Sequence, residues 1–120
     1  MQNLRLPLKN KWFEMTKSGI KTEDYREITP YWIKRLTSNF SFDINKHHLK
    51  LNENKDVINK GSMEAKTFIK NTMTLGYPKK GDTEKIISFK HKGIEIRTGN
   101  PDWGAEPDKL YFVILHGERC

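Results

Sequence analysis

The chain has 120 residues, a length typical of one domain with one modest core. Hydrophobic residues make up 35% of the sequence and charged residues 31%, so we expect a small core beneath an extensive polar surface. The 22 Lys and Arg residues outnumber the 15 Asp and Glu residues, and the resulting net charge of +7 favours anionic partners such as nucleic acid or nucleotides. No stretch approaches the roughly 18 apolar residues of a membrane-spanning helix, so we expect no membrane partner.

The first half of the chain predicts a strand, a helix, a charged strand and a second helix. Alternating leucines from residue 4 predict a short strand that ends near Pro7. Residues 9–18 have helical spacing, and Gly19 stands where a helix commonly ends, because glycine adopts the left-handed conformation without strain. Residues 21–28 then predict a strand with an unusual number of charges. Thr29, followed by proline, predicts the start of a second helix that ends near residues 38–39.

The second half is polar at first and then rich in strands. Residues 41–64 hold little to bury, and we expect a long loop or insertion there. Four runs then predict strands, at residues 67–70, 85–90, 94–97 and 110–115, with a turn at 91–93 between the second and the third. This order of elements favours an α+β fold, a barrel or sheet with two short N-terminal helices packed against it.

The charged strand is the best candidate for a functional site. A period of two would place Thr22, Asp24 and Arg26 on one face, with Lys21 in the turn before them. Arg26 suits bidentate recognition of phosphate or carboxylate, and Lys21 suits a point-charge contact to an anion. From the spacing alone, the simpler interpretation is an exposed strand whose charges form ion pairs with its neighbours.

Residues 19–26, GIKTEDYR, resemble the signature G-x-K-x-x-E-x-R of the ASCH family, with Asp24 where glutamate is usual. The flanking blocks LPLKNKWFEMTKSG and ITPYWIKRL and the tail GNPDWGAEPDKLYFVILHGE resemble those of small bacterial and phage members. The resemblance covers residues 6–36 and about 68–118, and residues 41–64 depart from the family pattern. It implies a single domain over residues 1–120, with a PUA-like β-barrel whose cleft holds the signature residues.

The resemblance also implies a set of functions. The family is generally thought to bind RNA, some small members are amidohydrolases that deacylate an acylated cytidine, and ribonuclease activity is known for others. In the amidohydrolase-like members a Lys, a Thr and a later Glu form the active site. Lys21 matches the Lys, whereas Asp24 stands at the Thr position. Candidates for the later Glu, by region only, are Glu64, Glu84 and Glu95.

Three hypotheses follow. In the first, the chain binds RNA or a nucleotide-like ligand through Lys21, Thr22, Asp24 and Arg26, with Trp103 stacking on a base. In the second, the chain is a hydrolase of a modified nucleoside or of RNA, with Lys21 and Asp24 as catalytic residues. In the third, residues 41–64 bind another protein. We expect no cofactor and no metal site, and the single cysteine, Cys120, together with an N-terminus that lacks a long apolar run, favours a cytoplasmic location.

Overall fold

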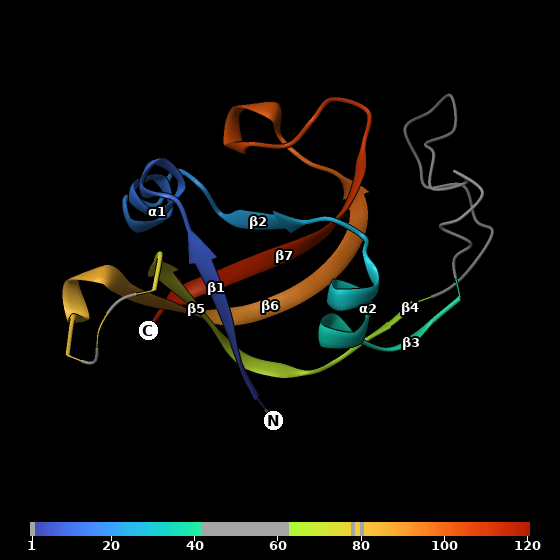
Figure 1. Cartoon of the computed structure of the whole chain (residues 1–120), viewed down its shortest axis with the longest axis horizontal. Coiled ribbons are helices and arrows are strands. Elements are labelled where there is room, and N and C mark those ends of the chain that lie inside the picture. Colours follow the sequence, from blue (N-terminus) through green and yellow to red (C-terminus); the bar gives the residue numbers. More distant parts are fainter. Residues whose placement is uncertain (1, 42–62, 78, 80) are drawn as a thin grey trace. The chain divides into compact units, whose positions relative to one another are not determined.

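The computed structural model describes residues 2–41, 63–77, 79 and 81–120 (Figure 1). It has the predicted α+β class, with a five-stranded sheet and two short α-helices in those residues. The chain divides into two compact units. Unit 1 comprises Met1–Asp24, Thr67–Gly93 and Leu115–Cys120, and unit 2 comprises Tyr25–Lys66 and Ile94–Ile114.

The strands of the larger sheet are in the order β1-β5-β6-β7-β2, and a separate pair consists of β3 and β4. The strands of the larger sheet are β1 (Gln2–Leu8), β2 (Glu23–Arg26), β5 (Phe68–Leu75), β6 (Ile86–Thr98) and β7 (Leu110–Arg119). The strands of the pair are β3 (Thr37–Phe40) and β4 (Met63–Ala65). The helices are α1 (Asn10–Lys17) and α2 (Pro30–Leu36), and the 3₁₀ turns are Thr83–Lys85 and Pro101–Trp103.

In unit 1, β1 runs parallel to β5 and the two strands share a core. Leu6 lies opposite Met73, and both side chains are fully buried. Helix α1 contacts β5 and buries Phe13 and Thr16. The aromatic core residue of this helix is Phe13, whereas its neighbour Trp12 is only half-buried.

The end of α1 determines where the charged strand begins. Gly19 has φ +86, the left-handed conformation that the sequence predicted for the helix end. Its main-chain N–H donates to the carbonyl of Thr16 at 3.1 Å, and the N–H of Lys21 donates to the carbonyl of Met15 at 3.0 Å. These bonds hold the main chain of Lys21 against the last turn of α1, two residues before β2 begins.

In unit 2, α2 begins as predicted. The Thr29 hydroxyl accepts a hydrogen bond from the N–H of Trp32 at 3.4 Å, and Pro30 opens the helix. The helix ends earlier than predicted, because Thr37 is already extended and begins β3. Leu36 and Phe112 are fully buried in the core of this unit.

Two predicted elements differ from the observed ones. The predicted turn at residues 91–93 is wrong, because β6 runs without a break from Ile86 to Thr98. Gly93 has φ +137 within that strand, so the glycine marks an irregular strand position, a common use of glycine in strands, rather than a reversal of the chain. The predicted strand at 21–28 is shorter, at Glu23–Arg26. Among the described residues, no helix has the length and apolar character needed to span a membrane.

Candidate functional site

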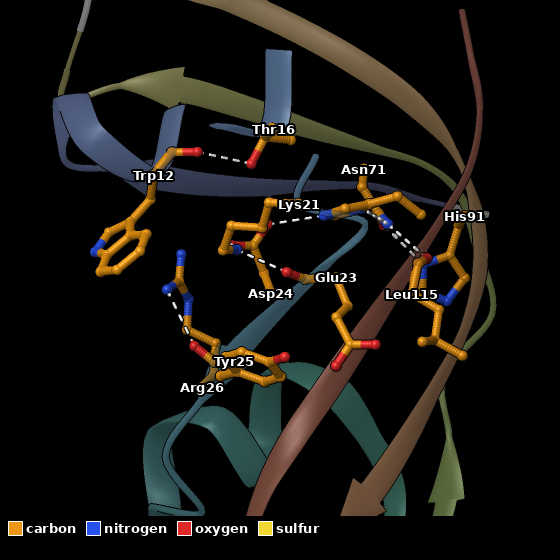
Figure 2. Close-up of polar contacts among 11 residues, drawn as sticks. Trp12, Thr16, Lys21, Glu23, Asp24, Tyr25, Arg26, Asn71, His91 and Leu115 are labelled. Carbon is orange, nitrogen blue, oxygen red and sulfur yellow. Dashed lines mark hydrogen bonds and ion pairs between the residues drawn. The ribbon is translucent and has the colours of Figure 1, made fainter. Parts of the chain in front are cut away.

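Lys21 and Asp24, both predicted as site residues, meet inside unit 1 (Figure 2). The Lys21 ammonium forms an ion pair with Oδ1 of Asp24 and also donates to the carbonyl of Glu23 at 2.6 Å. Each of the two side chains is only 2% exposed. A charged pair this deeply buried requires partners for its remaining hydrogen-bonding atoms.

His116 on β7 supplies one such partner. Its Nε2 lies 2.8 Å from Oδ2 of Asp24, and its side chain is buried. The main-chain N–H of His116 donates to the carbonyl of Thr22 at 3.1 Å, which fixes β7 against the start of β2. Asp24 therefore accepts from Lys21 with one oxygen and contacts His116 with the other. We call these three side chains, Lys21, Asp24 and His116, the Lys–Asp–His centre.

Asn71 on β5 extends the centre. Its Nδ2 lies 2.8 Å from Nδ1 of His116 and donates to the carbonyl of Leu115 at 3.1 Å. Its Oδ1 lies 2.7 Å from Nδ1 of His91 on β6 (Figure 2). Asn71 is fully buried, and His91 is half-buried. A continuous hydrogen-bonded network thus runs from Lys21 to His91 within unit 1.

Apolar rings flank the network. The ring of Phe89 lies 5.5 Å from the ring of His116, centroid to centroid, and the ring of Phe68 lies 5.2 Å from that of His91. Surroundings of this kind lower the local dielectric constant, which strengthens hydrogen bonds that are made and raises the cost of those that are lost.

The surroundings also set the ionisation of the network. Burial by itself would raise the pKa of Asp24, but the hydrogen bond with His116 and the charge of Lys21 outweigh it and hold that pKa well below the ordinary 3.8. Asp24 is therefore an anion at neutral pH. The pKa of His91 lies below its ordinary value, chiefly because of partial burial.

The other predicted site residues have different surroundings. Thr22 precedes β2 and is exposed. Arg26 belongs to unit 2, where it donates to the carbonyl of Tyr25 at 3.3 Å and its guanidinium lies 5.2 Å from the ring centre of Trp32. Trp103, also in unit 2, ends a 3₁₀ turn and is half-buried.

The structure describes the surroundings of each regional candidate for a second carboxylate. Glu64 lies in β4, Glu84 is exposed in a 3₁₀ turn, and Glu95 pairs with Arg97 at 2.9 Å. The carboxylate paired with Lys21 is Asp24. The predicted insertion at residues 41–64 falls largely on residues 42–62, outside the described residues. Within the described ranges, no group of three or more His, Cys, Asp or Glu side chains is arranged to hold a metal ion.

A hollow of about 500 Å³ lies elsewhere in unit 1, where β1 and β5 end and α1 begins. It is lined by Pro7, Leu8, Lys9, Asn10, Leu75 and Gly76. The residues of the Lys–Asp–His centre are not part of this lining.

No family model, curated protein or solved structure matches the chain.

Proposed function

We propose that this protein is a PUA-like domain of the ASCH type that binds a small nucleotide- or nucleoside-like ligand at the Lys–Asp–His centre. The observation that carries the proposal is the ion pair of Lys21 and Asp24, each 2% exposed and completed by His116. Buried ion pairs rarely add net stability, because the loss of hydration costs several kcal/mol for each ion. Ionisable groups with perturbed pKa values also gather at functional sites.

The burial of Lys21 bears on the kind of ligand. A side chain that is 2% exposed and bound to Asp24 is poorly suited to a sliding contact with a long phosphate backbone. A small ligand that reaches the centre would meet the ammonium of Lys21 and the carboxylate of Asp24, a donor and an acceptor that complement the mixed donors and acceptors of a nucleobase edge. This favours a nucleotide or nucleoside over non-specific binding of RNA.

The charge of unit 1 favours an anionic ligand. Its exposed basic residues include Lys9, Lys11, Lys17, Lys79, Lys85 and Lys92. Such a surface raises the local concentration of phosphate-bearing ligands and their rate of association. A cytoplasmic location belongs to the same proposal, because the single cysteine suits a reducing compartment.

Hydrolysis is the second candidate function, and the Lys21–Asp24 contact favours it. In this reaction water would add to the acyl carbon of an acylated cytidine, and the ammonium of Lys21, next to a carboxylate, would protonate the leaving nitrogen, so that cytidine and the free acid are released. Asp24 is a weaker candidate for the base, because its lowered pKa makes it a poor acceptor of a proton from water. Turnover would therefore depend on Lys21 more than on Asp24.

The experiment is a thermal-shift and mass-spectrometry panel of cytidine, cytidine monophosphate, acetylated cytidine and short RNAs. We expect cytidine monophosphate to raise the melting temperature of the wild type and not that of Lys21→Met. Lys90→Met, which removes an exposed lysine of the same unit, is the matched control and should retain the shift. Loss of acetyl from acetylated cytidine that requires Lys21 would establish the hydrolase. The absence of any shift or product across the panel would refute both functions.

A further inference from the structure

The amide of Asn71 has one orientation that satisfies its three neighbours. The Leu115 carbonyl can only accept, so the nitrogen Nδ2, 3.1 Å away, must face it. The other N–H of Nδ2 then points to Nδ1 of His116 at 2.8 Å, and Oδ1 is left to accept from Nδ1 of His91 at 2.7 Å. Turning the amide over would set its oxygen against the Leu115 carbonyl, with no proton between them.

This orientation fixes the proton on His116. Since Nδ1 of His116 accepts from Asn71, the ring proton must be on Nε2, which lies 2.8 Å from Oδ2 of Asp24. The hydrogen bonds run from His91 through Asn71 and His116 to Asp24, and each of them then joins one donor to one acceptor. Each oxygen of Asp24 then has one donor: Oδ2 accepts from Nε2–H of His116, and Oδ1 accepts from the Lys21 ammonium.

We infer that Asn71 and His116 are positioning residues of the Lys–Asp–His centre: Asn71 holds His116 as the neutral Nε2–H donor to Asp24, which keeps Asp24 ionised and paired with Lys21. The role in ligand binding rests on the proposed function, whereas the protonation state of His116 does not.

The same geometry separates this role from acid–base chemistry. Both ring nitrogens of His116 are engaged, one as donor to Asp24 and one as acceptor from Asn71. His116 therefore acts on the centre by donating a hydrogen bond and has no free ring nitrogen for proton transfer. A side chain that donates from the same position should replace it.

The first measurement is the long-range proton–nitrogen NMR spectrum of the imidazoles in the wild-type protein at neutral pH. We expect a protonated Nε2 and an unprotonated Nδ1 for His116. His91→Gln is the control, because the Leu115 carbonyl still orients the Asn71 amide and the His116 signals should keep this pattern. A proton on Nδ1 of His116, alone or together with one on Nε2, overturns the inference.

The second measurement compares His116→Gln with His116→Leu, using cytidine monophosphate as the probe. The amide nitrogen of glutamine reaches about as far as Nε2 and can donate to Asp24, so His116→Gln should bind the probe nearly as well as the wild type. His116→Leu leaves one oxygen of Asp24 without its donor, and affinity should fall roughly tenfold or more. Equal losses in both variants, or no loss in either, would refute the positioning role.

The two measurements distinguish failure of the proposed function from failure of the positioning role. If the wild type does not bind the probe, that function is refuted, while the NMR spectrum still decides the protonation state of His116. Asn71→Asp then gives an independent check, once circular dichroism has shown that the variant folds despite placing a carboxylate oxygen near the Leu115 carbonyl, because a carboxylate only accepts and should draw a proton onto Nδ1 of His116. An unprotonated Nδ1 in that variant would contradict the inferred link between the two residues.

Discussion

The substitution Asp24→Asn tests the energetics of the centre most directly. It keeps the shape of the side chain and removes its charge. Both neighbours of the carboxylate donate, since Lys21 faces one oxygen and Nε2–H of His116 faces the other. An amide offers only one acceptor, so whichever way it turns, its NH₂ meets a donor. Lys21 also loses the opposite charge while remaining buried.

We expect Asp24→Asn to lower the free energy of unfolding by about 3–5 kcal/mol at neutral pH, the cost of breaking a buried pair by removing one partner. Urea unfolding followed by circular dichroism should show a midpoint lower by on the order of 2 M, given a urea dependence of roughly 2 kcal/mol per molar for a domain of this size. The shift in melting temperature should be about 12–20 °C.

The matched control is Lys90→Met in the same unit. Lys90 pairs with Glu118 at 3.6 Å, but the two side chains are 68% and 85% exposed, so this pair should contribute only roughly 0–1 kcal/mol. If Asp24→Asn costs no more than Lys90→Met, the buried pair is not energetically coupled to the fold and the reasoning fails.

The remaining predictions concern pH, a close backbone approach and a helix cap. Asp24 and His91 both have lowered pKa values, so stability is lost as the pH falls, below about 3.8 through Asp24 and below about 6.5 through His91. His91→Gln should therefore make the free energy of unfolding less dependent on pH between pH 7 and 5, as urea unfolding at a series of pH values would show. Gly99→Ala should cost roughly 1–3 kcal/mol, because its Cβ would lie 2.6 Å from the ring of Tyr25, and thermal denaturation should reveal it. Thr29→Ala should cost about 1 kcal/mol in urea unfolding, through the loss of the α2 cap.

Local features of the sequence predicted the parts of the structure that local chemistry decides. Gly19 ends α1 because few other residues adopt its conformation, and Thr29 begins α2 because its hydroxyl caps the helix. The turn predicted at residues 91–93 was wrong because local sequence does not decide the structure there. A glycine in a strand-rich segment suits a turn or an irregular strand position equally well, and only the pairing of β6 with its neighbours decides between them.

In the candidate site, too, the contact between residues close in the sequence could be predicted, and the contacts between distant residues could not. Lys21 and Asp24 are three residues apart, and their proximity could be predicted from the sequence. His116 is 92 positions from Asp24, and Asn71 is 45 positions from His116. Nothing in the neighbourhood of either residue marks it as a partner, because their contacts depend on which strands lie side by side and in which register. A histidine that follows an apolar run of a strand is compatible with many environments.

The last prediction separates function from stability as the reason for the buried charges. Replacing the pair as a whole, with Lys21→Met and Asp24→Leu together, removes both charges. It leaves the Nε2–H of His116 without its acceptor, at about 1–3 kcal/mol, and takes away the hydrogen bond from Lys21 to the Glu23 carbonyl. Apolar replacement of a buried pair is often neutral or stabilising by roughly 1–4 kcal/mol, so the double variant should unfold within about 2 kcal/mol of the wild type and well above Asp24→Asn. It should nevertheless fail to bind cytidine monophosphate. A double variant as unstable as Asp24→Asn would mean that the pair holds the fold together, and the functional argument from its burial would lose its basis.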